Sequence, residues 1–146
     1  MNKQRFFVIF LAAVIFIIAL LLLSCREEGQ VVSKPDEYTR GFEASENTIL
    51  RVMMYVLREN GFGNAKIDSE QNRVESDYIT QSGWRSKCIA CVKKINWNEC
   101  DVTLSVITEK KTSTGWEMRR LLGKEQYDNL FNAIELQIYR EMYKVK

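Results

Sequence analysis

Histidine is absent from all 146 residues, and proline occurs once, at Pro35. Histidine is the base of Ser-His and Cys-His nucleophile pairs and the commonest metal ligand, so its absence excludes these arrangements. A glycine-rich phosphate loop is also missing, because Gly61-Phe62-Gly63 is better explained as the end of a helix. The composition therefore predicts a protein without a catalytic centre of these kinds, without a metal site and without a cofactor.

The chain also lacks an excess of charge of either sign once its first residues are set aside. Lys3 and Arg5 account for the whole formal net charge of +2, and the remaining 19 basic residues balance 19 acidic ones. A neutral domain does not have the net basic surface that nucleic-acid binding requires. We therefore expect no nucleic-acid partner.

The amino terminus has the plan of a secretory signal. Lys3 and Arg5 precede an uninterrupted apolar run from Phe6 to Leu23, and Ser24 and Cys25 follow it. The last four residues, Leu22-Leu23-Ser24-Cys25, resemble the lipobox of bacterial lipoproteins. The resemblance implies cleavage before Cys25 and acylation of that cysteine, so that lipid holds the rest of the chain at a membrane.

Other features of the leader bear on where the protein resides. Arg26, rather than Asp, follows the cysteine, which by analogy with Gram-negative lipoproteins implies the outer membrane and a domain in the periplasm. The alternative is an uncleaved transmembrane helix, since 18 apolar residues span roughly 27 Å of a hydrocarbon core about 30 Å thick. In both cases the body is expected outside the cytoplasm, because Lys3 and Arg5 hold the amino terminus inside.

Three segments are predicted: a signal peptide over 1–24, the lipidated cysteine with a flexible tether over 25–43, and one domain over 44–146. The tether is predicted from a polar stretch that contains Pro35 and shows no sustained period. No internal repeat is visible.

Two helices are predicted at the two ends of the domain. Ser45 is a suitable helix cap, and an apolar stripe follows before Asn60-Gly61 ends the helix; its members are Ile49, Val52, Met53, Val56 and Leu57. A second helix is expected over 124–142, with Tyr127, Leu130, Ile134, Ile138 and Met142 on one face.

Between the helices, alternating apolar and polar residues predict four or five antiparallel strands. The expected ranges are 65–68, 73–80, 84–94, 100–108 and 116–119. The predicted fold class is therefore α+β: a two-layer sandwich with the N-terminal and C-terminal helices on one face of the sheet. This order weakly resembles the helix-grip-like domains of outer-membrane lipoproteins such as BamC, the accessory of β-barrel assembly. The resemblance implies an accessory role in the cell envelope.

Three cysteines lie in the predicted strand region. Cys88 and Cys91 form a C-x-x-C, and Cys100 follows. A zinc site would lack ligands, and a redox motif belongs at a helix start rather than in a strand. A disulfide from Cys100, to Cys91 or alternatively to Cys88, is expected in an oxidising compartment unless a tight hairpin places Cys100 near Lys94.

Charged residues supply two further candidates. Glu75 and Asp77, with Glu70 nearby, are spaced as a carboxylate dyad on one strand face, but a solvated outer face is the favoured interpretation, because Val74 and Tyr78 occupy the opposite side. A set of basic residues is expected together on the outer sheet face, near the Lys110-Lys111 pair; its members are Arg85, Lys87, Lys93 and Arg119. This set would bind anionic lipid or an acidic partner, or it would protect the sheet from aggregation.

The sequence thus supports three hypotheses. The leading one is a non-enzymatic, membrane-tethered accessory that docks on a protein partner of an envelope complex. The second is a module that binds an apolar ligand or lipid in a pocket near Trp84, Trp116, Tyr78 and Phe131. The third is a thiol-redox protein that uses Cys88 and Cys91.

Overall fold

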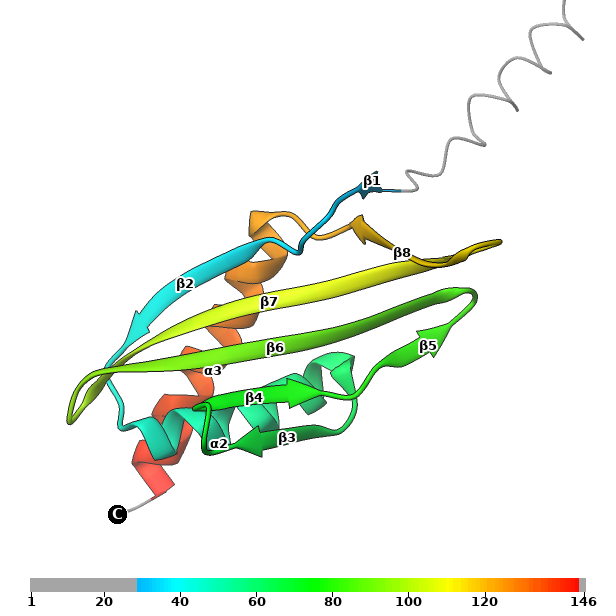
Figure 1. Cartoon of the computed structure of the whole chain (residues 1–146). Helices are drawn as coiled ribbons and strands as arrows, with labels where there is room; N and C mark the ends of the chain where they lie inside the picture. The colour runs from blue at the N-terminus through cyan, green and yellow to red at the C-terminus, as the bar shows by residue number, and fades with distance from the viewer. Residues whose placement is uncertain (1–28, 145–146) are drawn as a thin grey trace, which may run out of the picture.

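A computed structural model describes residues 29–144, which fold into helices and an antiparallel sheet, so the α+β class is confirmed (Figure 1). The predicted leader and Cys25 lie outside the described residues. In chain order the elements are β1 (Gln30–Val31), β2 (Glu37–Phe42), α2 (Glu46–Leu57), a short helical turn η1 (Arg58–Phe62), β3 (Ala65–Asp68), β4 (Arg73–Ser76), β5 (Ile79–Gln81), β6 (Trp84–Asn96), β7 (Glu99–Thr112), β8 (Gly115–Arg120) and α3 (Lys124–Lys144).

Helix α2 forms where the capping and stripe signals predicted it. The Ser45 side chain accepts a hydrogen bond from the Thr48 backbone N–H at 3.4 Å, which satisfies one of the free donors of the first turn. The whole predicted stripe is buried. Gly61 takes a φ of 84°, a left-handed conformation that costs glycine little, and there the chain turns away from the helix.

The sheet is built around the long β6–β7 hairpin. Its strands have 13 and 14 residues, which at about 3.3 Å per residue gives a hairpin more than 40 Å long. On one side β6 pairs with β4 and then β5, and β3 pairs with β4. On the other side β7 pairs first with β2 and further along with β8, to which β1 adds two residues.

The core lies between the sheet and the helices. α2 packs against β3, β4 and β6, and α3 packs beside α2 and against β2. Tyr127, Phe131 and Ile134 of α3 are almost fully buried in the same apolar cluster as Met53 and Leu104. The predicted face of α3 is thus buried except at its end, where Met142 is 53% exposed.

The sheet has eight strands rather than the predicted four or five. The segment 73–80 divides into β4 and β5, because Asp77 leaves the ladder and donates its backbone N–H to the Asn64 carbonyl oxygen. β1 and β2 are the other additions.

The expectation of a flexible tether was wrong for residues 37–42. These residues pair along their whole length with β7, from Glu37 opposite Ser105 to Phe42 opposite Cys100. Tyr38 packs on the core and Phe42 is 6% exposed, so burial of these alternating aromatic rings stabilises the strand. The ordered body therefore begins before residue 44.

Neither helix in residues 29–144 combines the length and the hydropathy that crossing a membrane requires.

Candidate functional site

The outer face of the sheet carries a compact group of charged and aromatic side chains. The Arg85 guanidinium lies between the rings of Tyr78 and Trp116, at 4.3 and 4.4 Å from their centroids. Its Nε donates to the Glu109 carboxylate at 2.5 Å, and this carboxylate is largely shielded from water. Arg85 is thus held by stacking and by charge at once, so it is already partnered within the chain.

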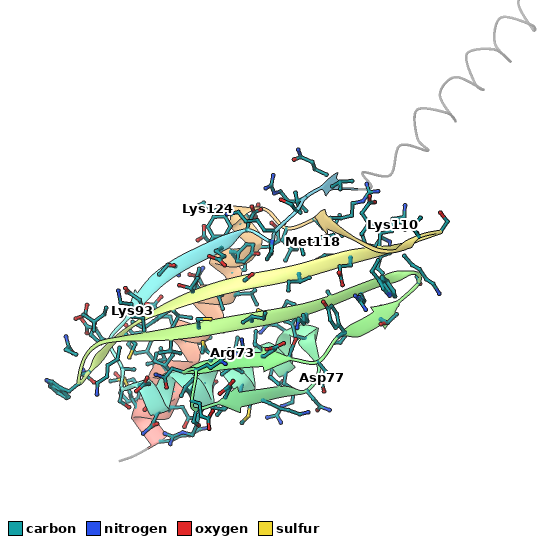
Figure 2. All side chains as sticks on the ribbon, viewed as in Figure 1. Arg73, Asp77, Lys93, Lys110, Met118 and Lys124 are labelled. Carbon is teal, nitrogen blue, oxygen red and sulfur yellow. The ribbon has the colours of Figure 1, made fainter. Side chains whose placement is uncertain are left out.

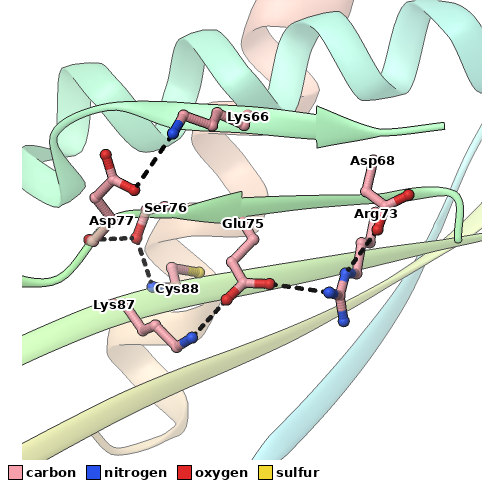
Figure 3. A network of polar contacts seen from close by, with 8 residues as sticks. All are labelled: Lys66, Asp68, Arg73, Glu75, Ser76, Asp77, Lys87 and Cys88. Atoms are coloured by element: carbon pink, nitrogen blue, oxygen red, sulfur yellow. Dashed lines mark hydrogen bonds and ion pairs between the residues drawn. The ribbon is translucent and has the colours of Figure 1, made fainter.

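A second ion network lies beside this group, on β3, β4 and β6 (Figure 3). Glu75 accepts from Lys87 Nζ at 2.5 Å and faces Arg73 at 3.2 Å, and Arg73 also lies 3.5 Å from Asp68. The hydrogen bond from Lys87 lowers the pKa of Glu75 from its ordinary value. Glu75 is therefore an ionised structural partner.

Glu75 and Asp77 do not form a carboxylate dyad, the less favoured of the two interpretations of their spacing. Asp77 lies beyond the end of β4 and pairs with Lys66 at 3.9 Å, whereas Glu75 pairs with Lys87 and Arg73. Glu70 lies in the β3–β4 turn, where its backbone N–H donates to Asp68. Because Glu75 and Asp77 have separate cationic partners, they do not share a proton site.

The structure also divides the predicted basic set. Arg85 and Lys87 lie together on the outer face, but Lys93 lies near the far end of the hairpin, opposite the end that carries Lys110 (Figure 2). Arg119 was wrongly placed: Met118 pairs with Glu109 of the outer face, so its neighbour Arg119 points to the other face of the sheet. There Arg119 is ion-paired with Glu117. A single basic face made of all four residues is therefore not present.

The expected disulfide is absent, since Cys88, Cys91 and Cys100 are all free thiols. The β6–β7 turn is tight, and its register places Cys100 opposite Lys94, three positions from Cys91. Cys91 is exposed on the outer face, whereas Cys88 and Cys100 are buried among apolar side chains. Burial raises the pKa of the Cys88 thiol to about 12, so Cys88 has the properties of a small apolar core residue.

A hollow of about 520 Å³ lies at the other face of the sheet, at the end of the hairpin that carries Trp84. It is bounded by the turn after α2, by β5 to β7, and by the Leu121-Leu122 segment that leads into α3. The lining residues are Asn60, Gly61, Phe62, Ile79, Gln81, Ser82, Trp84, Arg85, Ser86, Val106, Thr108, Leu121 and Leu122.

The hollow exists because the helices are shorter than the hairpin. α2 ends at Leu57, well before the end of the hairpin that carries β5 and β8 (Figure 1). Beyond that point the sheet presents Ser86 and Thr108, whose short side chains leave space between Trp84 and Val106. A surface that the helices would otherwise cover is therefore open to solvent.

The lining of the hollow is mainly apolar. Phe62, Ile79, Trp84, Leu121 and Leu122 provide apolar walls, and hydroxyl and amide groups lie between them. Among the described residues that line it, none is a carboxylate or a thiol, and Arg85 is the one charged residue. In the same described part of the chain, no three Cys, Asp or Glu side chains are arranged to hold a metal ion. The volume lies within the range of about 300–1,000 Å³ typical of small-molecule sites.

The pocket predicted from the sequence agrees with the hollow only at Trp84. Trp84 lines it, but Tyr78 and Trp116 lie on the outer face with Arg85, and Phe131 is 2% exposed in the solid core. The four residues named from the sequence therefore do not surround one pocket, and the hollow lies beyond the end of α2. Ser86 and Thr108 were missed. The signal in the sequence was a small polar residue at an inward-facing position of each strand, next to an inward position that carries an apolar side chain.

No family model and no curated protein sequence matches this chain. Among solved structures, the chain is similar to norcoclaurine synthase of Thalictrum flavum, a point mutant in complex with a transition-state analogue. The TM-score is 0.52 at 10% identity, and the match covers 77% of this chain and 98% of the synthase. A conserved protein from Geobacillus kaustophilus matches with a TM-score of 0.36 at 11% identity, over 74% of this chain and 94% of its own. The likeness to the synthase concerns the fold alone.

Proposed function

We propose that this chain is a membrane-anchored protein of the cell envelope whose domain binds a small, mainly apolar molecule in the hollow beside Trp84. The observation that carries the proposal is the hollow itself. Its apolar walls come from three separate parts of the chain, around Phe62, Trp84 and Leu121. A molecule that fills it removes these side chains from water, at about 25 cal/mol per Å² of apolar surface buried.

The anchor is the second part of the proposal. The segment Leu22-Leu23-Ser24-Cys25 resembles a lipobox, and an acylated Cys25 would hold the domain at the membrane. We further propose that α2 and α3 form one layer on the sheet, which leaves the hollow as the open end of a two-layer body. The role we propose is non-enzymatic: the polar side chains in the lining are hydroxyls and amides, and the guanidinium of Arg85 is engaged by Tyr78, Trp116 and Glu109 on the outer face.

Photochemical labelling tests the binding function. The full-length protein, in the membranes of the cells that make it, is exposed to a short alkyl compound that carries a diazirine, and labelled peptides are identified by mass spectrometry. We expect label on β5, on the start of β6 and on the segment 121–122. Ser86→Phe would fill the hollow and remove this label, whereas Cys91→Phe adds the same ring to the exposed outer face of the same strand and would leave the label unchanged. Equal labelling in the two variants would contradict the proposal.

A docking role on an envelope complex is favoured by a different observation. At the closed end of the β6–β7 hairpin, Trp97 is 81% exposed and Ile95 is 48% exposed. Tyr139 and Tyr143, on the final turns of α3, are 52% and 72% exposed. Exposed aromatic groups are enriched where proteins meet. Crosslinking in intact cells should join Trp97 peptides to one protein partner in stoichiometric yield, and recovery of no such partner would count against docking.

A further inference from the structure

The position of the hollow relative to the membrane anchor suggests where its ligand comes from. Gly29 packs directly on the wall of the hollow: a Cβ atom built on this glycine would lie 2.5 Å from Leu121 Cδ2. Leu121 and the next residue, Leu122, both line the hollow. Gly29, the first described residue of the chain, is therefore in contact with a side chain that lines the hollow.

The segment that follows Gly29 is fixed to the sheet. The Gly29 carbonyl oxygen accepts from Arg119 Nη1 at 3.2 Å, Gln30 and Val31 pair with Arg120 and Arg119, and the Val32 backbone N–H donates to Met118. Because these contacts hold β1 beside β8, the wall of the hollow keeps a fixed relation to the point where the chain departs toward the membrane.

Covalent geometry then limits the distance to the anchor. Cys25 precedes Gly29 by four residues, and four residues span at most about 13–14 Å. If the apolar run instead remains as a membrane helix, Leu23 precedes Gly29 by six residues, which span at most about 22 Å. With either anchor the mouth of the hollow stays close to the lipid surface, while the closed end of the hairpin is free to lie more than about 40 Å further away.

We propose that the hollow binds an acyl chain of a phospholipid from the bilayer that holds the anchor. This inference rests on the proposed binding function and specifies its ligand. The lining is compatible with an acyl chain. Apolar side chains form its walls, among them Phe62, Trp84 and Leu122, and no carboxylate lines the described part of the site. An apolar ligand that stayed in the bilayer would reach this site without crossing water.

The tryptophans of the chain provide the test, because one lies in the hollow and the others do not. Trp84 lines the hollow, Trp116 stacks on Arg85 at the outer face, and Trp97 is exposed at the opposite end. Two double variants of the full-length protein each keep a single tryptophan. The variant with Trp97→Phe and Trp116→Phe keeps Trp84 in the hollow. The variant with Trp84→Phe and Trp116→Phe keeps Trp97 at the opposite end. Each is reconstituted in vesicles of phosphatidylglycerol and phosphatidylethanolamine, with or without bromine atoms on the acyl chains.

Bromine quenches tryptophan emission at contact range, so we expect brominated vesicles to reduce Trp84 emission strongly and Trp97 emission little. Adding Ser86→Phe to the Trp84 reporter should restore the emission, and adding Cys91→Phe should not. If Ser86→Phe fails to fold, as judged by circular dichroism, Leu121→Asn replaces it, because Leu121 is 43% exposed and a polar group there weakens the wall with little cost to the core.

Other outcomes would overturn the inference in distinguishable ways. Quenching of Trp84 that Ser86→Phe leaves unchanged would mean that the domain only rests on the surface. Quenching that appears only after Cys25→Ala would mean that the acyl chain of the anchor itself fills the hollow. No quenching, together with diazirine label in the hollow, would reject the bilayer as the source and leave the binding function standing. No quenching and no label would reject both.

Discussion

The Tyr127 hydroxyl provides a hydrogen-bond acceptor at a point where β7 has no neighbouring strand on one side. Removing this hydroxyl tests how much the hydrogen bond contributes to stability. β2 pairs with β7 up to Ser105, and β8 pairs with β7 only from Glu109. The Val106 backbone N–H lies in the gap between them and donates to Tyr127 Oη at 3.0 Å. The same hydroxyl donates to the Asp36 carbonyl oxygen at 3.1 Å, and burial raises the pKa of Tyr127, which keeps the proton in place.

Tyr127→Phe keeps the ring and removes only the hydroxyl. The buried Val106 N–H then has no acceptor, which costs about 1–3 kcal/mol. The Asp36 carbonyl is part-buried, and water replaces its lost donor at little further cost. We therefore expect the free energy of unfolding to fall by about 1–3 kcal/mol.

Urea unfolding of the full-length protein, followed by fluorescence, measures this change. At a slope of about 1–3 kcal/mol per molar urea, the midpoint should fall by roughly 1 M with the slope unchanged. Tyr139→Phe is the matched control, since this tyrosine lies on the same helix and is 52% exposed; its effect should stay within about 0.5 kcal/mol. If Tyr127→Phe is as stable as Tyr139→Phe, the hydroxyl does not close the gap.

Three further predictions follow from the packing and the charges. In the native protein, Cys91 should react with a soluble aromatic disulfide, whereas Cys88, with a pKa of about 12, is a thiolate about once in 10⁴ molecules at pH 8; mass mapping that finds Cys88 modified as fast as Cys91 would refute its burial. The pKa of Glu75 is lower in the folded state, so its ion pair stabilises the protein above the unfolded pKa and is lost as pH falls through the folded pKa. Glu75→Gln should therefore lose less stability than the wild type on acidification below about pH 4.5, and parallel pH profiles from thermal melts would contradict this. Arg85→Lys removes the planar group from between Tyr78 and Trp116 and should cost about 1 kcal/mol; urea midpoints that do not differ would show that the stacking contributes nothing.

The sequence predicted those elements whose signals are local. Ser45, the apolar stripe and Asn60-Gly61 define α2 without any knowledge of its neighbours. The alternation along 84–94 and 100–108 likewise identified the two central strands and the side that each residue faces. Both strands proved longer than predicted, because their ends extend past the core, where polar residues weaken the alternation.

Features that depend on register were not predictable in the same way. Trp116 and Met118 alternate with Glu117 and Arg119, and a strand this short fits the sheet with either face inward. The pairing of Met118 with Glu109 determines which face of β8 points inward, and it places Arg119 on the inner side. The same holds for Cys100, since its partner is fixed by a turn whose length the sequence left open.

The hollow could not be predicted because no single segment encodes it. It results from the difference between where α2 ends and where the hairpin ends, combined with small residues at Ser86 and Thr108. β2 was different, since the alternation of Tyr38 and Phe42 was present in the sequence but lay in a stretch dominated by charged residues and Pro35.

Mass spectrometry of the protein extracted from its own membranes, under native and then denaturing conditions, tests the account most directly. We expect a mature chain that begins at an acylated Cys25 and carries an additional lipid, which denaturation releases and which Ser86→Phe lacks. A chain that still begins at Met1 without fatty acid would contradict the anchor. Loss of the same lipid from wild type and from Ser86→Phe alike, or no bound lipid in either, would contradict the ligand site.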